Sequence, residues 1–291
     1  MRISKTIYFF FIPGLILYAL FFLYPTISAI FYSFTNWDGI SENFNFVGLE
    51  NYEKAVTGDS VFVKSVGNNL EFMLFVVIFQ TIIALIFAIL LVKNTKVNYL
   101  LRALFFFPTI LSSVSVAFIW TFVYDPSLGI LNQLLSLIGL EFLTQNWLGN
   151  GNIAIYSLAF TQVWFHAGQM LIIFVAGLHA IPFDLYEAAK IEGATKWQTF
   201  KKVTWPLLAP SATIVIAYTT IQSFQAFDLV FAMTGGGPNN TTEIISTYIY
   251  EIAFRGYDFG YASAISVLFM AMIALITFIQ FKVLRSNRVS Y

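Results

Sequence analysis

The sequence contains no cysteine and few charged residues, and each shortage excludes a class of chemistry or of fold. Without cysteine among its 291 residues, the chain can form no disulfide, thiolate metal site or thiol redox centre. Charged residues make up 10% of the sequence, whereas hydrophobic residues make up 58% and the mean hydropathy is +0.77. A soluble domain of this length needs a more charged surface. The composition therefore predicts an integral membrane protein.

Further absences limit what the chain could bind or catalyse by itself. The motif Gly-x-x-x-x-Gly-Lys-Ser/Thr, which holds nucleotide phosphates, occurs nowhere in the sequence. The formal net charge is zero and no basic face is clustered, which argues against a nucleic-acid partner. His166 has no second histidine or carboxylate at metal-ligand spacing, and His179 is expected to cap a helix end. With no Ser/His/Asp constellation, paired buried acids or metal cluster, we expect no cofactor and no enzyme activity.

Six apolar runs are each long enough for about 20 helical residues, the length that crosses a hydrocarbon core of about 30 Å. They cover residues 7–31, 70–92, 103–124, 153–178, 207–233 and 261–284. The first run follows Arg2 and Lys5, as in a signal peptide, but it is too long and lacks a small-residue cleavage site, so we interpret it as a retained helix. The sequence predicts an all-α membrane protein with six transmembrane helices in a single domain, residues 1–291.

The basic residues set the expected orientation. With the N-terminus in the cytoplasm, the residues on the cytoplasmic side are Arg2, Lys5, Lys93, Lys96, Arg102, Lys190, Lys196, Lys201, Lys202, Lys282, Arg285 and Arg288. Those left outside are Lys54, Lys64 and Arg255. Both termini are then cytoplasmic. The longest outer segment, residues 35–69, is expected to be a covering loop or a small subdomain, with a possible helix near residues 49–56.

A polar segment at residues 184–206 lies between the fourth and fifth runs, on the cytoplasmic side. Asp184 and Glu187 have the spacing of a capping box, which predicts a short helix over residues 185–192. Gly193 then stands where a helix ends most readily, because glycine adopts positive φ. The segment therefore begins as a helix followed by a bend.

The second half of this segment repeats the capping pattern. Thr195 and Gln198 predict the start of a second short helix, which Trp205 and Pro206 are expected to break. Helices of about eight residues do not persist alone in water. The segment must therefore pack against another surface, either on its own protein or on a partner.

The same segment resembles the cytoplasmic loop signature of permease subunits of binding-protein-dependent ABC importers. That signature is Glu-Ala-Ala, three residues, Gly, nine residues, an aliphatic residue, one residue and a hydrophobic-Pro pair. The matching positions and their neighbour are Glu187, Ala188, Ala189, Gly193, Ala194, Val203 and Pro206. Val203 and Trp205 depart mildly from the usual Ile and Leu. The resemblance implies a type I importer permease in which residues 184–206 form a coupling helix that seats in a groove of the ATPase.

A second motif follows the fifth run. Its glycines and proline exclude a continuing helix and permit a tight turn at the outer face. The residues are Thr234, Gly235, Gly236, Gly237 and Pro238. Thr-Gly-Gly-Gly-Pro at this distance is typical of one partner of the permease pair in the carbohydrate branch of the family. The resemblance therefore implies a sugar importer and a contact loop for the solute-binding protein.

Polar residues within the apolar runs mark a candidate substrate path, because a polar group in a membrane needs a partner or water. They are Gln162, His166 and Gln169 on the fourth run, and Thr219, Gln222, Ser223 and Gln225 on the fifth. Amides can donate to and accept from sugar hydroxyls, which predicts a polyol cavity. The alternative is interhelical hydrogen bonding, worth about 0.6 kcal/mol per contact. Asp228 is expected to serve in a pairing or a gate.

The resemblance covers nearly the whole chain and implies an assembly in a bacterial-type cytoplasmic membrane. Its partners would be a second permease, two ATPase subunits and an extracytoplasmic solute-binding protein, with ATP hydrolysed outside this chain. Relatives also carry glycerol phosphate or sugar acids, so the sugar itself stays open. A secondary transporter is a remote alternative, because only Glu71 and Asp228 offer intramembrane charge for ion coupling.

Overall fold

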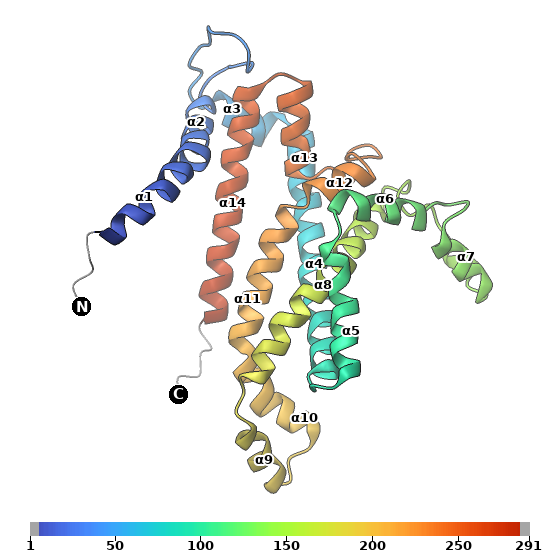
Figure 1. Ribbon diagram of the computed structural model, residues 1–291. Coiled ribbons are helices and arrows are strands. Elements are labelled where there is room, and N and C mark those ends of the chain that lie inside the picture. The colour runs from blue at the N-terminus through green and yellow to red at the C-terminus, as the bar shows by residue number, and fades with distance from the viewer. Residues whose placement is uncertain (1–5, 286–291) are drawn as a thin grey trace. The chain divides into compact units, whose positions relative to one another are not determined.

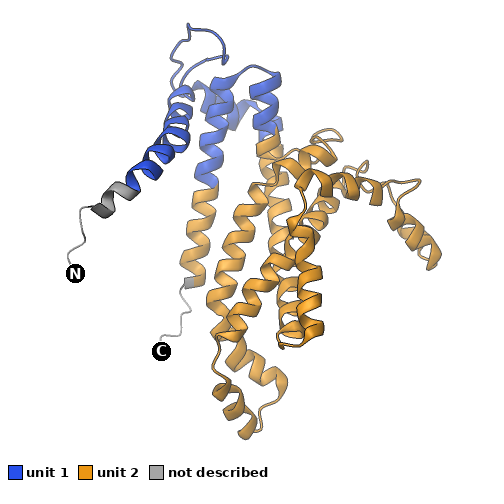
Figure 2. Ribbon diagram, in the orientation of Figure 1, with its two compact units in different colours: residues 1–63, 248–272 blue, residues 64–247, 273–291 orange. Residues whose placement is uncertain are grey.

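The computed structural model describes residues 6–285, in which helices make up almost all regular structure (Figure 1). The only β pairing within that range is an isolated antiparallel bridge between Thr35 and Phe46. The all-α fold is therefore confirmed. Two compact units divide the chain, residues 1–63 with 248–272 and residues 64–247 with 273–291 (Figure 2). Arg2, Lys5 and Arg288, which entered the predicted orientation, lie outside the described residues.

Within the described residues, five helices are long and apolar enough to cross a membrane, and a bent pair makes a sixth span if it is counted as one. The five are Phe11–Tyr32, Ser60–Leu91, Ala154–His179, Lys196–Phe224 and Phe259–Leu284. The bent pair consists of Lys96–Ile110 and Ser113–Val123, at an angle of 100°. The apolar run over residues 103–124 is therefore not one uninterrupted helix, as the sequence predicts, but a bent pair. The chain tightens into a 3₁₀ turn at Pro108, then extends through Leu111 and Ser112 before the next helix begins.

The first unit contains short helices and the ends of longer ones. Its elements are α1 (Thr6–Tyr18), a π-helical turn (Ala19–Leu23), α2 (Tyr24–Tyr32), α3 (Glu50–Glu53), a π-helical turn (Lys54–Gly58), the start of α4 (Ser60–Leu91), the end of α13 (Ile245–Tyr250), a π-helical turn (Glu251–Arg255) and the first half of α14 (Phe259–Arg285). The buried amide of Asn51 donates to the carbonyls of Ser33 and Thr35 at 3.0 and 2.8 Å. The outer loop after α2 is therefore tied to α3.

The second unit holds the remaining helices. They are the rest of α4, α5 (Lys96–Phe106), a 3₁₀ turn (Phe107–Ile110), α6 (Ser113–Val123), α7 (Ile130–Leu137), a 3₁₀ turn (Glu141–Leu143), α8 (Ala154–His179), α9 (Phe183–Ile191), α10 (Lys196–Thr199), a π-helical turn (Phe200–Thr204), α11 (Trp205–Phe224) and α12 (Phe227–Met233). Helix α8 is the centre of this unit, packed against α5, α11 and α12. Its fully buried Leu158 belongs to one hydrophobic cluster, and its fully buried Phe174 belongs to a second.

Two glycines let the helices of the second unit approach closely. A Cβ atom on Gly168 would lie 1.9 Å from the carbonyl oxygen of Phe105, and one on Gly177 would lie 2.2 Å from Ser211 Oγ. Beside the first contact, the Thr109 hydroxyl donates to the carbonyl of Phe165 at 2.9 Å. Small residues at helix crossings allow this spacing inside membranes. Gly168 therefore fixes the distance between α8 and α5.

The side chain of Arg102 caps the cytoplasmic end of α4. Arg102, which is 8% exposed, donates from Nε to the carbonyl of Leu91 at 2.8 Å and from Nη2 to that of Val92 at 2.7 Å. The last carbonyls of a helix have no partner within the helix, and a guanidinium can satisfy several at once. Arg102 thus joins the end of α4 to α5.

The fifth apolar run is not one helix. Helix α11 ends at Phe224, and α12 begins at Phe227 after two residues that leave helical geometry. The prediction of one helix over residues 207–233 is therefore wrong, and Asp228 is an exposed residue in the first turn of α12. The predicted helix break at Trp205 and Pro206 is also wrong, because one continuous helix runs over Lys196–Phe224. Within this helix, the π-helical turn Phe200–Thr204 lies just before Pro206 and accommodates the proline.

Candidate functional site

The segment between α8 and α11 begins differently from the prediction. Helix α9 starts at Phe183 after Pro182, whose backbone is extended (φ −58°, ψ 132°), and no side chain caps it. The predicted capping box of Asp184 and Glu187 is therefore wrong. Proline already fixes its own φ ahead of the helix. Asp184 instead lies in the first turn, where a negative charge faces the positive end of the helix dipole.

The bend at Gly193 is confirmed. Its φ is +73°, and the Ala194 N–H donates to the carbonyl of Ala189 at 2.9 Å while the Gly193 N–H donates to that of Lys190 at 3.1 Å. This pair of bonds is the Schellman motif, which needs a left-handed residue at Gly193. A Cβ atom there would meet nothing within 4 Å, so the backbone angle alone selects glycine.

The second cap is also confirmed. Thr195 Oγ1 accepts from the Gln198 N–H at 3.3 Å, and Gln198 Oε1 accepts from the Thr195 N–H at 2.8 Å. These bonds start α10, which leads without interruption into α11. The hydroxyls of Tyr186 and Thr204 lie 3.2 Å apart and join α9 to the start of this long helix. This contact links α9 to the long helix that contains α11.

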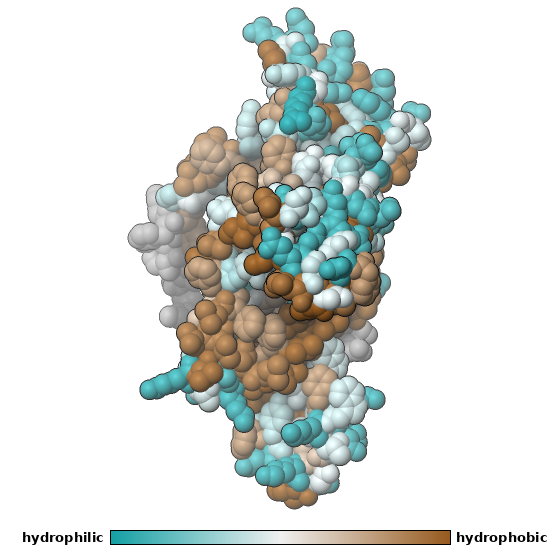
Figure 3. Space-filling view, turned by 90° about the vertical axis from the view of Figure 1, so that its right-hand side faces the viewer, coloured by the Kyte–Doolittle hydropathy of each residue, from teal (hydrophilic) through white to brown (hydrophobic). Residues whose placement is uncertain are grey.

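Helices α9 and α10 project beyond the ends of α8 and α11 (Figure 1) and expose large apolar side chains. Ile191 is 87% exposed, Trp197 70% and Phe183 69%. Hydrophilic side chains also gather at this end of the face drawn in Figure 3, below the hydrophobic surface of the long helices. Among the predicted coupling residues, Glu187, Ala188 and Gly193 are exposed, and Ala189, Ala194, Val203 and Pro206 are half-buried. Exposed apolar groups with a polar rim are typical of a protein interface.

A cavity of about 290 Å³ lies where the two broken helices meet. The residues that line it are Leu111, Ser113, Gln162, Phe165, His166, Gln222, Gln225, Ala226, Asp228 and Leu229. Leu111 and Ser113 flank the 100° bend before α6, and Gln225 and Ala226 form the break between α11 and α12. Non-helical backbone within a membrane is tolerated where protein buries it or where it lines a cavity. Both breaks therefore serve the same polar cavity.

The structure brings together only part of the predicted substrate path. Gln162, His166, Gln222 and Gln225 line the cavity, and Gln169, Thr219 and Ser223 do not. The Gln169 amide donates to the Tyr218 hydroxyl at 3.1 Å. Thr219 and Ser223 are fully buried, and the Ser223 hydroxyl donates to the carbonyl of Thr219 at 2.7 Å. Serine and threonine in helices satisfy themselves in this way, which a polar stripe in the sequence does not reveal.

Sequence reasoning missed two groups near the cavity. Ser113 donates to Asp228 Oδ2 at 3.1 Å, a pairing across 115 residues that requires the bend before α6. The amide of buried Gln80 lies 3.4 Å from both Thr219 Oγ1 and Gln222 Oε1. Gln80 is an amide near the middle of the apolar second run, and a polar side chain at that depth was the available signal.

Two buried polar atoms near the cavity have no hydrogen-bond partner among the described residues. In the described part of the chain, His166 Nδ1 and Gln80 Oε1 are buried and have no hydrogen-bond partner. Buried polar atoms in native proteins are nearly always satisfied by protein, water or ligand. The site therefore has hydrogen-bonding capacity beyond what the chain itself uses. No group of three histidine or acidic residues among the described residues could hold a metal ion.

The glycine-rich loop after α12 is held by its own bonds and by α4. Gly235 and Gly236 have φ of +55° and +87°, and the Thr242 hydroxyl donates to the carbonyl of Gly237 at 2.6 Å. Lys64 Nζ and the Asn68 amide donate to the carbonyls of Asn239 and Asn240 at 2.7 and 2.9 Å. The loop thus presents exposed Gly235, Asn239 and Asn240 on a fixed backbone.

The chain is similar to membrane components of solute importers. A family model described as "Binding-protein-dependent transport system inner membrane component" matches residues 80–289. The multiple sugar-binding transport system permease protein MsmF of Streptococcus mutans is 37% identical over 94% of this chain and 93% of its own length. The trehalose/maltose transport system permease protein MalF of Thermococcus litoralis is 32% identical over 99% of this chain and 96% of its own length.

A solved structure shares the fold. It is a chain of a bacterial alginate ABC transporter in complex with an alginate pentasaccharide-bound periplasmic protein. The TM-score is 0.84 at 20% identity, and the match covers 98% of this chain and 96% of that one. This likeness confirms the importer permease fold that the sequence predicts.

Proposed function

This chain belongs to the family of binding-protein-dependent transport system inner membrane components, and from that premise we propose that it is the permease subunit of an ATP-driven importer for a neutral sugar. It is a multi-pass inner-membrane protein, as its sequence predicts. The names of the relatives MsmF and MalF, which refer to multiple sugars and to trehalose and maltose, support a sugar substrate. This assignment concerns the class of substrate and leaves the individual sugar open.

The cavity at the two helix breaks is the observation that carries the proposal. Gln162, Gln222 and Gln225 place amides around it, and each amide can both donate to and accept from a hydroxyl. Asp228 adds a carboxylate that accepts hydrogen bonds only. A sugar presents many hydroxyls and no charge, so this lining matches its chemistry.

The same lining disfavours the anionic alternatives, glycerol phosphate and sugar acids. The lining residues of this cavity include no lysine or arginine, and the Asp228 carboxylate would repel a phosphate or a carboxylate substrate. Anion sites in proteins usually employ arginine or lysine. A neutral sugar is therefore the better match for this chain.

We further propose that α9 and α10 form the coupling unit that receives the motion of a separate ATPase subunit. The exposed side chains of Phe183, Ile191 and Trp197 offer an apolar docking surface. Movement of the unit would be passed along the helix Lys196–Phe224, which carries Gln222 into the cavity. ATPase closure would thereby change access to the bound sugar.

The outer partner in this scheme is a solute-binding protein. Its proposed contact is the loop Thr234, Gly235, Gly236, Gly237 and Pro238. Lys64 and Asn68 donate to the carbonyls of Asn239 and Asn240, the two residues that follow this loop, and so hold its end. A second permease subunit would complete the translocation path. The rigid backbone of this loop favours docking without a large loss of conformational entropy.

Uptake by the reconstituted importer tests the proposal. Gln162→Leu and Gln222→Leu each remove an amide from the cavity, so substrate affinity should fall by about 1–3 kcal/mol while assembly persists. Uptake of several neutral sugars, a sugar acid and glycerol phosphate would be measured in vesicles, with ATP hydrolysis followed in parallel.

The matched control is Gln280→Leu, because the Gln280 amide donates to Thr220 Oγ1 at 2.7 Å outside the cavity. This control should lower thermal stability without changing the preference among substrates. If both cavity variants behave as the control does, the glutamines hold helices together and the cavity is not the substrate path. Uptake driven by an ion gradient without ATP would favour a secondary transporter instead.

A further inference from the structure

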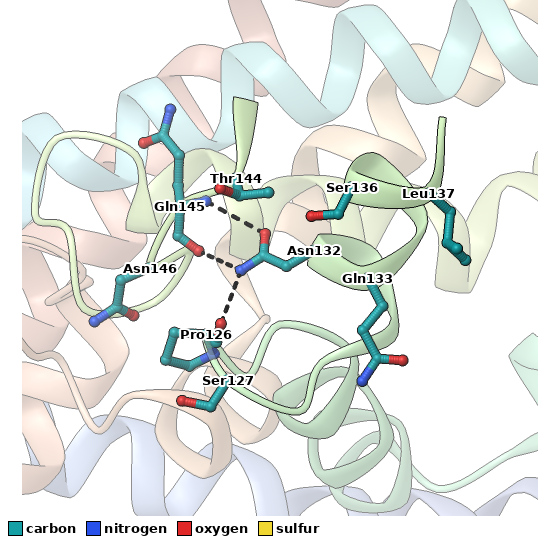
Figure 4. A pocket seen from close by; sticks show the side chains of 9 residues that line it. All are labelled: Pro126, Ser127, Asn132, Gln133, Ser136, Leu137, Thr144, Gln145 and Asn146. Carbon is teal, nitrogen blue, oxygen red and sulfur yellow. Dashed lines mark hydrogen bonds between the residues drawn. The ribbon is translucent and has the colours of Figure 1, made fainter. Parts of the chain in front are cut away.

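A second concave site lies in the outer segment between α6 and α8. It has a volume of about 730 Å³, within the range of about 300 to 1,000 Å³ typical of small-molecule sites. Hydroxyl and amide side chains dominate its lining, among them Ser127, Gln133, Ser136, Gln145 and Asn146 (Figure 4). None of the described residues that line it is acidic or basic. The site is therefore polar and neutral.

Asn132 holds the walls of this outer pocket together. Its Nδ2 donates to the carbonyls of Pro126 and Gln145 at 3.3 and 2.9 Å, and its Oδ1 accepts from Trp147 Nε1 at 2.8 Å, with the bonds to Pro126 and Gln145 drawn in Figure 4. One amide thus joins α7 to the turn before it and to the loop after it. Such a fully bonded side chain gives the pocket a defined shape.

The turn that opens the pocket is equally constrained. Asp125 Oδ1 accepts from the N–H groups of Ser127 and Leu128 at 2.9 and 2.7 Å. A Cβ atom on Gly129 would lie 2.2 Å from the carbonyl oxygen of Asp125, so the turn closes only with glycine there. The pocket is therefore built by local bonds.

Several polar atoms of the lining lie on exposed side chains and bond to no other group of the described residues, so that water or a ligand can reach them. Within the described residues, the hydroxyls of Ser127 and Ser136 and the Nδ2 of Asn146 take part in no hydrogen bond. Gln145 is engaged only through its backbone and its Oε1, which leaves its Nε2 for a ligand. A neutral polyol can satisfy such a mixture of donors and acceptors, whereas an ion would require opposite charge.

The pocket continues toward the outer loop and α12. A neighbouring concavity of about 390 Å³ shares Pro126 and Asn146 with it and is also lined by Met233 and Gly237. Met233 ends α12, whose first turn carries Asp228 of the membrane cavity. Helix α12 therefore runs from the membrane cavity, at Asp228, to the concavity beside the outer pocket, at Met233.

We propose that this outer pocket binds one unit of a neutral saccharide before the saccharide reaches the membrane cavity. This inference rests on the proposed sugar importer function and adds a second contact site to it. The unused amide and hydroxyl groups supply the hydrogen bonds, and Asn132 supplies the shape. Neither the coupling unit nor the glycine-rich loop is needed for this binding.

A local fluorescence probe tests the site. Because the chain has no cysteine, Leu137→Cys would carry a single environment-sensitive dye at the rim of the pocket. The full chain would be placed in lipid nanodiscs and titrated with maltotetraose, a neutral oligosaccharide. We expect a saturable dye response, and Gln145→Glu or Asn146→Asp should raise the Kd about tenfold by removing an amide donor.

Two matched variants separate the pocket from other sites. Asn152→Asp makes the same chemical change at an exposed position outside the pocket and should leave the Kd unchanged. Gln162→Leu, in the membrane cavity, should also leave the Kd measured at the rim unchanged. Melting temperatures would confirm that all variants are folded.

The outcomes distinguish this inference from the proposed function. No dye response, or a response that Gln145→Glu and Asn146→Asp do not weaken, overturns the outer site even if sugar uptake is found. Loss of binding-protein stimulation in those variants with unchanged saccharide affinity would make the segment a protein contact and also overturn it. Tenfold weakening in both variants supports the site, and absence of sugar uptake would then refute the importer function alone.

Discussion

Gly193 shows how one backbone angle can determine the form of a functional segment. Its φ of +73° allows the two bonds that end α9, and no neighbouring atom lies within 4 Å of the position that a side chain would take. The requirement is therefore conformational and not one of space. Asparagine tolerates this region better than other residues with a side chain.

Gly193→Leu should weaken the docking of the ATPase and the coupling of ATP hydrolysis to transport. A left-handed conformation costs a residue with a Cβ atom about 1–2 kcal/mol, which would shift the bend between α9 and α10. Gly193→Asn should retain most of the coupling. The measurement is uptake per ATP hydrolysed in vesicles, with capture of the ATPase as a second readout. Equal loss in both variants would show that the side chain, and not φ, causes the defect.

Asp59 is a carboxylate whose neighbours in the first unit favour its ionised form. Partial burial opposes its ionisation, but hydrogen bonds from the hydroxyls of Tyr248 and Tyr261 and from the N–H groups of Phe62 and Val61 outweigh burial, so the pKa of Asp59 lies below the usual 3.8. These bonds hold the start of α4 to α13 and α14 within the first unit. The ionised carboxylate therefore stabilises the fold.

The contribution of Asp59 should depend on pH in one direction. Because its folded pKa is lowered, the stabilisation is complete above the unfolded pKa, the usual 3.8, and is lost as the pH falls through the folded value. Hydrogen-exchange protection over residues 59–63 should therefore fall on acidification below about pH 4. Asp59→Asn should show lower protection at neutral pH and a flatter profile. Asp38→Asn, at an exposed loop position, should leave this protection unchanged.

At the scale of elements, helix spacing and helix breaks shape the second unit. Gly168 brings α8 against the backbone of α5, and the bend that follows α5 turns Ser113 toward Asp228. The cavity exists because α11 also ends early, at Phe224. A change in the α8–α5 distance should therefore affect stability before it affects chemistry.

Gly168→Ala should destabilise the protein by about 1–3 kcal/mol, because the new Cβ atom would lie 1.9 Å from a backbone oxygen and the helices would have to separate. Gly67→Ala is the matched control. Gly67 lies in α4 with open space around it, so alanine should stabilise the helix by about 0.5–1 kcal/mol. Melting temperatures in detergent would measure both. A stable Gly168→Ala variant would contradict the close approach of the two helices.

At the scale of the whole molecule, the chain exposes apolar side chains at α9 and α10 and has no nucleotide motif of its own. The apolar side chains of α9 and α10 are exposed at the end of long apolar helices, and Gly-x-x-x-x-Gly-Lys-Ser/Thr is absent from the sequence. Exposed apolar groups of this kind favour burial in an interface. The proposed function therefore requires a larger assembly.

The chain should copurify with an ATPase and a second permease when all three are expressed together. Ile191→Glu should weaken ATPase capture tenfold or more, because a central apolar contact in an interface is worth roughly 1–2 kcal/mol or more. Its melting temperature alone should not change, since Ile191 is 87% exposed. Ile40→Glu, at a position 76% exposed in the outer loop, is the control and should leave capture intact. A functional homo-oligomer without any ATPase would refute the assembly.

The sequence by itself determined the features that depend on neighbouring residues. The bend at Gly193 and the cap of Thr195 and Gln198 involve bonds over a few residues, so composition and spacing were sufficient to predict them. The apolar runs likewise indicate membrane helices by length alone. The predicted cap at Asp184 failed because Pro182 had already set the start of α9.

Only the tertiary structure decided where the helices break and which polar groups meet. An apolar run has the same hydropathy whether it is straight or broken, so the bend at Leu111 and the break at Gln225 could not be read from it. The Ser113 hydroxyl donates to Asp228, and Gln162 lines the same cavity as these two residues. The three residues are far apart in the sequence, so only the folded chain brings them together. Thr219 and Ser223 lie on α11 with Gln222, which lines the cavity, but their own side chains are fully buried in the protein. Non-local packing selects which polar side chains face a cavity, because it decides which of them are satisfied by neighbouring helices and which remain for a ligand.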